Sequence, residues 1–211
     1  MTAAIAVLAS GGGTNLQALI DASAASGAYR VTRVVSNRSS AGALDRARRA
    51  GLTATVLKNP ADPTELLTAL GDVDLAVLAG YLKLVPAPVV ARFRWRMINI
   101  HPALLPAFGG PGMYGLRVHA AVLASGATVT GATVHYVDEA FDRGPVITQW
   151  PVPVRAGDTA DALAGRVLAV EHQLLPNVVA ELARRDFPPG LRLHAAGTAF
   201  AASNTPALDL R

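Results

Sequence analysis

Short apolar runs alternate with amphipathic segments through the first hundred residues of this 211-residue chain. Uninterrupted runs such as Ile5–Ala9 and Leu75–Ala79 are typical of strands that are buried on both faces, and the segments between the runs carry apolar residues at helical spacing. Strands separated by helices in this way indicate parallel βαβ units. The pattern predicts strands at Ile5–Ala9, Val31–Val35, Thr53–Leu57, Leu75–Ala79 and Met97–Ile100, and helices through Leu16, Leu19 and Ile20 and at Ala41–Ala50, Pro63–Leu70 and Pro86–Phe93.

The second half of the chain is richer in predicted strand and ends in the longest helical pattern. We therefore expect a single doubly wound α/β domain of Rossmann-like form, with a mostly parallel sheet, over residues 1–194, followed by an Ala/Thr/Ser-rich tail at 195–211 without a clear period. The elements predicted here are a helix at Leu116–Leu123, strands at Thr128–Val137 and Val146–Val154 joined by the acidic loop Asp138–Pro145, and a helix at Asp158–Leu182 capped by Asp158 or Thr159.

Composition excludes several classes of site. The chain has no cysteine, which rules out disulfides, a thiolate nucleophile and a cysteine-ligated metal. Its 19 Lys and Arg against 15 Asp and Glu give a net charge of +4, and the basic residues are scattered rather than gathered in the stripe that nucleic acids usually require. No apolar run approaches the length of a membrane span, and Met1–Ala9 lacks the features of a signal peptide. We expect a soluble, cytoplasmic monomer or homodimer that binds neither nucleic acid nor a membrane.

The segment Ser10–Gln17, SGGGTNLQ, lies between the first predicted strand and the first predicted helix. Its three glycines allow a ligand to approach the backbone, and the following helix offers unpaired N–H groups and a positive dipole end to an anion. The segment lacks the Gly-Lys-Ser/Thr ending of a Walker A loop, and Leu16 stands where G-x-G-x-x-G requires its last glycine. Two interpretations stay open: a phosphate-binding turn, or a tight strand-to-helix turn with Thr14 or Asn15 as N-cap.

Asn99 and His101 form a second candidate site at the end of the fifth predicted strand. Side chains two residues apart on a strand point to the same face, and open parallel sheets bind ligands at the carboxyl ends of their strands. Asn99 offers an amide N–H to a developing oxyanion, and His101 offers a group that titrates near neutrality. Pro102 fixes the backbone directly after the two residues. The arrangement therefore favours a catalytic role for Asn99 and His101 over the alternative, a polar pair that merely ends the strand.

A third candidate combines strand residues with the loop that follows them. Thr133 and His135 share one face of a predicted strand, and Asp142 lies in the next loop. A carboxylate near an imidazole can raise the imidazole pKa or hold its orientation. We expect Asp142 to be catalytic and His135 and Thr133 to support or orient the reacting groups; a buried strand histidine and a turn aspartate are the alternatives. No metal site is predicted, because metal-ligand spacing is absent among the other histidines, His119, His172 and His194.

Six segments occur together in an order that points to a known family. They are SGGGTNLQ at 10–17, SNR at 36–38, LAGYLKLV at 78–85, INIHPALLP at 98–106, GATVHYVDEAFDRGPVI at 131–147 and VEHQLLP at 170–176. In these segments the chain resembles the folate-dependent phosphoribosylglycinamide formyltransferases, from residue 4 to about residue 194. The resemblance implies transfer of a formyl group from 10-formyltetrahydrofolate to the amine of 5-phospho-ribosylglycinamide in purine biosynthesis, without a metal.

The resemblance also implies a role for each matching residue. The catalytic trio corresponds to Asn99, His101 and Asp142, the phosphate turn to Gly13, Thr14 and Asn15, and the acid that contacts the ribose hydroxyls to Glu171. The segments that enclose the folate correspond to Leu82, Lys83, Leu84 and Val85, to Asn99, and to Asp138, Glu139, Ala140 and Phe141.

Two departures from the family concern the folate side of the site. Family members often carry an arginine near position 64 that helps to hold the folate carboxylate tail, whereas this chain has Thr64. Lys83 and Arg117 are candidate replacements by charge alone. The stretch 108–125 is also several residues longer than in common members, which changes the shape of an active-site loop.

Rival functions share parts of this pattern. Methionyl-tRNA formyltransferase and formyltetrahydrofolate deformylase share the Asn-x-His pair and the later Asp. The first normally adds a C-terminal OB-like domain and lacks the glycine turn, and the second adds an N-terminal regulatory domain, so we expect neither in a chain of 211 residues. A non-catalytic nucleotide-binding module would use the glycine turn but leave Asn99, His101 and Asp142 unexplained.

Overall fold

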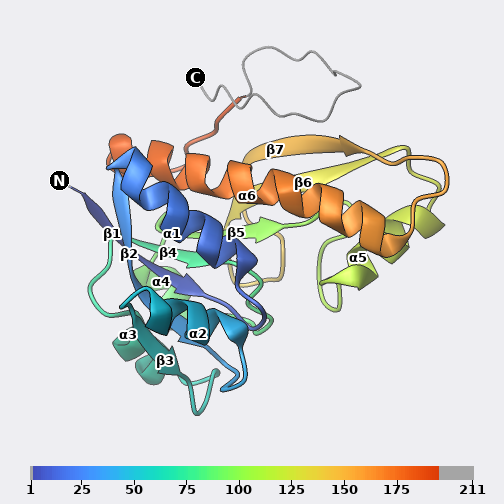
Figure 1. Ribbon diagram of the computed structural model, residues 1–211. Coiled ribbons are helices and arrows are strands. Elements are labelled where there is room, and N and C mark those ends of the chain that lie inside the picture. The colour runs from blue at the N-terminus through green and yellow to red at the C-terminus, as the bar shows by residue number, and fades with distance from the viewer. Residues whose placement is uncertain (1, 195–211) are drawn as a thin grey trace.

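The computed structural model describes residues 2–194, so the tail expected at 195–211 lies outside the described residues. One seven-stranded sheet, in the order β3-β2-β1-β4-β5-β6-β7, runs through the domain (Figure 1). Its strands are β1 (Ala3–Leu8), β2 (Tyr29–Ser36), β3 (Thr53–Val56), β4 (Leu75–Leu78), β5 (Met97–His101), β6 (Val129–Tyr136) and β7 (Val146–Pro153). The helices are α1 (Thr14–Ser26), α2 (Gly42–Arg49), α3 (Pro63–Leu70), α4 (Ala87–Arg92), α5 (Leu116–Ala124) and α6 (Ala160–Arg184).

Strand direction divides the sheet into two parts. β1 to β5 pair in parallel, whereas β6 pairs antiparallel with both β5 and β7. The predicted doubly wound, mostly parallel α/β fold is therefore confirmed, together with its β-rich second half and long C-terminal helix. The strand order reverses between β1 and β4, which creates the switch point where open α/β sheets bind ligands.

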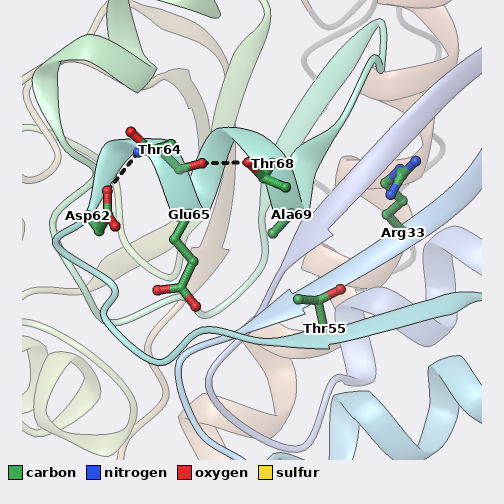
Figure 2. A pocket seen from close by; sticks show the side chains of 7 residues that line it. All are labelled: Arg33, Thr55, Asp62, Thr64, Glu65, Thr68 and Ala69. Atoms are coloured by element: carbon green, nitrogen blue, oxygen red, sulfur yellow. Dashed lines mark hydrogen bonds between the residues drawn. The ribbon is translucent and has the colours of Figure 1, made fainter.

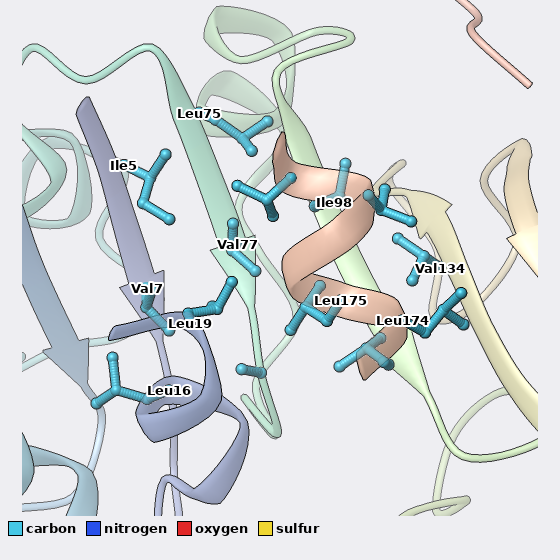
Figure 3. Packing of buried hydrophobic residues seen from close by; sticks show 14 of the residues in the cluster. Ile5, Val7, Leu16, Leu19, Leu75, Val77, Ile98, Val134, Leu174 and Leu175 are labelled. Carbon is cyan, nitrogen blue, oxygen red and sulfur yellow. The ribbon is translucent and has the colours of Figure 1, made fainter. Parts of the chain in front are cut away.

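The uninterrupted apolar runs of the sequence arise because both faces of the sheet are covered. In β1, Ile5 and Val7 pack in the core that α1 and α6 cover, whereas Ala6 and Leu8 pack in the core that α3 and α4 cover. Figure 3 shows the first of these cores, with α1 and α6 lying across β1, β4 and β5. Alternate side chains of one strand therefore enter two different cores, as the pleat requires.

Two helices, α3 and α6, begin at a residue whose side chain caps them. Asp62 caps α3 by accepting a hydrogen bond from the Thr64 N–H at 2.8 Å, and Thr159 caps α6. Helix α1 instead has Gly13 as its N-cap, with φ +75° and no side-chain cap. The interpretation with Thr14 or Asn15 as N-cap is wrong, because both lie inside the first helical turn, after the left-handed residue.

Candidate active site

Three neighbouring strands bring the candidate segments to one edge of the sheet. β1 leads into the glycine turn, β4 into Leu82–Val85, and β5 ends at His101. Ser10 links the first two segments, since its N–H donates to the Gly80 carbonyl at 3.0 Å and its Oγ accepts from the Leu82 N–H at 2.9 Å. The carboxyl ends of β1, β4 and β5 therefore form one continuous candidate site.

Asn99, His101, His135 and Asp142 form a single side-chain cluster at this edge. The β5–β6 pairing places Asn99 opposite His135. Asn99 Nδ2 lies 3.0 Å from His135 Nε2 and donates to Asp142 Oδ1 at 3.3 Å. The other carboxylate oxygen, Oδ2, lies 3.5 Å from His101 Nδ1. The structure thus brings the predicted trio together and places His135 in direct contact with Asn99.

Backbone carbonyls define which ring nitrogens of the two histidines carry a proton. A carbonyl oxygen only accepts, so the 2.9 Å contact with the Phe108 oxygen places a proton on His101 Nε2, and the 2.7 Å contact with the Tyr136 oxygen places one on His135 Nδ1. With that proton on Nδ1, His135 accepts from Asn99 through Nε2. Both hydrogens of the Asn99 amide are consequently engaged, one by His135 and one by Asp142, and the lone pair of neutral His101 Nδ1 faces the carboxylate.

Burial and charge act in opposite directions on this cluster. Burial lowers the pKa of His101, and although the nearby Asp142 carboxylate and the Phe108 carbonyl act to raise it, burial prevails. The sequence suggested that Asp142 raises the pKa of His135 or holds its orientation; at His101 a pKa-raising contribution of Asp142 is present but is smaller than the effect of burial. Burial would also raise the pKa of Asp142, but contacts with His135, His101 and the Gly110 N–H hold it below its usual range. Near neutrality Asp142 is ionised and His101 is neutral.

The loop after β5 supplies two groups that the sequence did not reveal. The Phe108 carbonyl accepts from His101, and the Gly110 N–H donates to Asp142 Oδ2 at 2.9 Å. Between them, a Cβ on Gly109 would lie 3.1 Å from Asp142 Cβ. Backbone groups carry no residue identity, so the only sequence signal was the run of glycines in the loop.

Thr133 lies beside the cluster but contacts a different segment. Its Oγ1 donates to the Ala103 carbonyl at 2.6 Å and accepts from the Leu105 N–H at 3.1 Å. The Thr133 side chain therefore shapes the turn that follows His101, and it makes no hydrogen bond to the side chains of Asn99, His101 or Asp142.

Asn15 and Glu171 meet at the start of α1, from opposite ends of the chain. Asn15 Nδ2 donates to Glu171 Oε2 at 2.6 Å. Glu171 is buried, which raises its pKa to about 7 even though the Asn15 hydrogen bond opposes that shift. Asn15 Oδ1 is also buried and has no hydrogen-bond partner among residues 2–194.

The two segments matched to folate binding each contain exposed residues. In the first, Leu82 is half-buried, Lys83 and Leu84 are exposed and Val85 is buried. The Lys83 and Leu84 N–H groups have no acceptor within the part of the chain that the structure describes. In the second, Asp138 and Phe141 are half-buried, and Glu139 and Ala140 are exposed.

Position 64, where the family often has arginine, lies in a pocket of about 400 Å³ between α3 and the strands β2 and β3 (Figure 2). Arg33 from β2 is the cation among its lining residues, which sequence reasoning did not identify. Of the candidates proposed by charge, Arg117 stacks over the Tyr114 ring at 5.1 Å, and Lys83 lies exposed after β4. None of the Asn99 cluster lines this pocket, which is lined by Arg33, Thr55, Asp62, Thr64, Glu65, Thr68 and Ala69.

Residues 2–194 contain neither a metal-binding cluster of side chains nor a membrane-spanning helix. No group of three or more His, Cys, Asp or Glu side chains has the arrangement of a metal site. No helix in the same range has the length and apolar character needed to cross a membrane.

Comparison with known proteins places these observations in a family. A family model described as formyl transferase matches residues 3–179. A chloroplastic phosphoribosylglycinamide formyltransferase from Vigna unguiculata is 44% identical over 187 residues, which cover 84% of this chain and 60% of that protein. The phosphoribosylglycinamide formyltransferase of Escherichia coli (strain K12) is 38% identical over 184 residues, covering 83% and 84% respectively. This chain thus spans most of the bacterial relative but less than two thirds of the plant relatives, 60% and 63% of their lengths.

Solved structures give the same assignment. The phosphoribosylglycinamide formyltransferase of Anaplasma phagocytophilum matches with a TM-score of 0.81 and 35% identity, over 93% of this chain and 90% of that one. Glycinamide ribonucleotide transformylase 1 of Symbiobacterium toebii matches with a TM-score of 0.78 and 42% identity, over 93% and 92%. Sequence and fold agree over the segment that carries the Asn99 cluster and the glycine turn, and the chain belongs to the formyl transferase family.

Proposed function

We propose that the chain transfers a formyl group from 10-formyltetrahydrofolate to the amine of 5-phospho-ribosylglycinamide. The observation that carries this proposal is the contact of Asn99, His101 and Asp142 at the carboxyl end of β5, one amide donor and one acid–base pair within hydrogen-bonding reach of one another. Relatives that share the fold are named phosphoribosylglycinamide formyltransferases, which supports this choice among formyl transfers.

The cluster suits the attack of an amine on a formamide. The formyl oxygen gains negative charge during the attack and needs a donor, which Asn99 Nδ2 provides. Both Asn99 hydrogens are engaged, so the formyl oxygen takes the place of one existing acceptor. That acceptor is Asp142 Oδ1, which accepts the longer of the two hydrogen bonds, at 3.3 Å. His135 holds the amide in place through the other hydrogen.

Proton movement falls to His101 and Asp142. The attacking ammonium must lose protons, and the departing folate nitrogen must gain one. His101 Nδ1 is the open basic atom of the cluster, because Nε2 is bonded to the Phe108 carbonyl. A proton that arrives at Nδ1 is stabilised by the ionised Asp142 at 3.5 Å and is held there until the leaving nitrogen accepts it.

The glycine turn suits the phosphate of the substrate. The N–H groups of residues 11–16 have no acceptor among residues 2–194. These residues form the turn before α1 and its first helical positions, where the helix dipole favours an anion. The Asn15–Glu171 pair lies on the same helix start. Its carboxylate and the unpartnered Asn15 Oδ1 offer acceptors for the two ribose hydroxyls.

The folate fits the remaining edge of the site. The unpaired N–H groups of Lys83 and Leu84 offer backbone donors to a heteroaromatic ring, and the loop 138–141 faces solvent after β6. We assign Leu82–Val85 and Asp138–Phe141 to the binding of the pterin.

A side-by-side assay with two formyl acceptors tests the proposal. Purified protein is given 10-formyltetrahydrofolate with 5-phospho-ribosylglycinamide or with initiator methionyl-tRNA, and formylated product is measured by mass spectrometry. We expect product from the ribonucleotide alone. Formylation of the tRNA, or of neither acceptor, would contradict the assignment.

A further inference from the structure

Helix α2 packs directly on the glycine turn and binds two of its carbonyls. The Ala43 N–H donates to the Gly11 carbonyl at 3.1 Å, and Arg46 Nε donates to the Gly12 carbonyl at 2.8 Å. The contact is close, because a Cβ on Gly13 would lie 2.7 Å from Ala43 Cα and a Cβ on Gly42 would lie 3.3 Å from the Gly12 oxygen. The turn therefore rests on α2 through its backbone.

These two bonds determine where the next N–H groups point. In a planar trans peptide the C=O and N–H bonds are antiparallel, and the peptides of the turn are trans. A Gly11 carbonyl that faces α2 therefore turns the Gly12 N–H away from α2, and a Gly12 carbonyl that faces Arg46 does the same for the Gly13 N–H. Both N–H groups lack an acceptor in the described part of the chain. They are thus held open on the side opposite to α2.

Arg46 is well built for this task. Its Nη1 donates to Gln17 Oε1 on α1 at 3.2 Å, so the guanidinium bridges the turn and the helix that follows it. A planar fork that bonds two acceptors keeps its orientation better than a flexible ammonium. The Arg46 charge also lies at the negative end of the Gly12 carbonyl dipole, on the side away from the open N–H groups.

We propose that Arg46 is a positioning residue for the substrate phosphate, acting through the Gly12–Gly13 peptide to hold the anion-binding N–H groups open. This inference rests on the proposed function, since it assumes that the phosphate binds at the glycine turn. Without Arg46, the Gly12 carbonyl loses its partner and the peptide is free to rotate, which would present an oxygen to the anion.

The test compares Arg46→Met and Arg46→Lys with Arg49→Met. Arg49 is exposed on the same helix, and its side chain makes no hydrogen bond or ion pair with residues 2–194, which makes it a matched control. Loss of a charge-assisted hydrogen bond predicts a rise in KM for the ribonucleotide of about tenfold in Arg46→Met, with kcat unchanged. Arg46→Lys, which keeps a charged donor but not the planar fork, should recover part of the loss, and Arg49→Met should match the parent protein.

Two further measurements separate a phosphate role from a purely structural one. Calorimetry with the dephosphorylated riboside should show unchanged affinity in Arg46→Met; equal weakening of both ligands would overturn the proposal. Inorganic phosphate, added in a thermal-shift titration, should stabilise the parent and Arg49→Met but not Arg46→Met, and equal stabilisation of all three would also overturn it. A parent protein that binds phosphate but fails to formylate the ribonucleotide would contradict the proposed function alone.

Discussion

Asn99 and His135 face each other across the β5–β6 ladder, with 3.0 Å between Asn99 Nδ2 and His135 Nε2. The Tyr136 carbonyl holds the proton on the other ring nitrogen, so His135 is an acceptor whenever it is neutral. The Asn99 side-chain amide is therefore not free to flip, and its nitrogen stays on the side of His135 and Asp142. The donor needed for a formyl oxygen is oriented before any substrate binds.

Replacing His135 should therefore impair catalysis more than binding. In His135→Leu the amide loses one of its two anchors, and we expect kcat to fall about tenfold while KM for the ribonucleotide changes little. His135→Gln retains an acceptor and should be impaired less. Steady-state kinetics of both variants decide the matter, and equal losses in the two would argue against an orienting role.

Asp142→Asn removes the charge that stabilises a proton on His101. We expect turnover to drop on the order of a hundredfold or more, the range of a lost general acid–base group, with ribonucleotide binding nearly intact by calorimetry. Asp72→Asn is the control, because that carboxylate is fully exposed. Its ion pair with Arg92 is long, at 3.8 Å, and lies on the surface, where such pairs contribute little. Near-full formyl transfer by Asp142→Asn would show that the catalytic assignment is wrong.

Gly13→Val tests the phosphate turn. Its φ of +75° disfavours any side chain, and a Cβ would lie 2.7 Å from Ala43 Cα, so we expect a loss of about 2 kcal/mol in unfolding free energy and weaker binding of the phosphorylated substrate. Gly165→Ala is the control, because it lies in α6 outside the turn and its Cβ meets no atom within 4 Å, so binding of the phosphorylated substrate should not weaken. Equal binding of the ribonucleotide and its dephosphorylated form by the parent protein would rule out a phosphate site here.

Glu171 makes stability depend on pH in a defined direction. Because burial raises its pKa to about 7, the folded state keeps a proton that the unfolded state has already lost above pH 4.5. Stability from this group is therefore fully present below pH 4.5 and declines as pH rises to about 7. Glu171→Gln cannot titrate, so its unfolding free energy should gain about 3 kcal/mol relative to the parent between pH 4.5 and pH 8.

Urea unfolding of both proteins across this range measures the difference. Burial lowers the pKa values of the buried histidines His101 and His119 and of the half-buried His172. These groups act in the opposite direction, with stability lost as pH falls below their ordinary value of 6.5. They are present in both proteins and cancel in the comparison. Parallel pH profiles for the parent and Glu171→Gln would contradict the prediction.

Gly109→Ala tests the loop that holds His101 and Asp142. The added Cβ would lie 2.5 Å from Leu105 Cδ2 and 3.1 Å from Asp142 Cβ, so the loop must shift and loosen the Gly110–Asp142 bond. We expect a several-fold loss of kcat for a stability cost of about 1 kcal/mol. Gly165→Ala, in α6 with open space around the new Cβ, should instead stabilise the protein by about 1 kcal/mol with unchanged kcat.

Local signals predicted the elements well where they act within a few residues. Helix α3 has the predicted bounds, Pro63–Leu70, because the Asp62 cap, the first-turn proline and the following Gly71 all act locally. The start of α1 was predicted wrongly, since the conformation of Gly13 depends on the approach of Ala43 from another helix. The candidate residues Asn99, His101 and Asp142 were all identifiable from type and position. The contacts of Asp142 with the Gly110 N–H, and of His101 with the Phe108 carbonyl, were not.

Periodicity, turn residues and motif order are properties of the linear chain, and they were enough to predict the α/β class, the strand ends that carry the candidate site and the family resemblance. Three relationships became visible only in the folded chain: His135 contacts Asn99, burial keeps His101 neutral beside a carboxylate, and α2 turns the N–H groups of the glycine turn outward. Each of these depends on strand register, on burial, or on a contact between distant segments. Strand register, burial and long-range contacts exist only once the strands have paired and the helices have packed on the sheet.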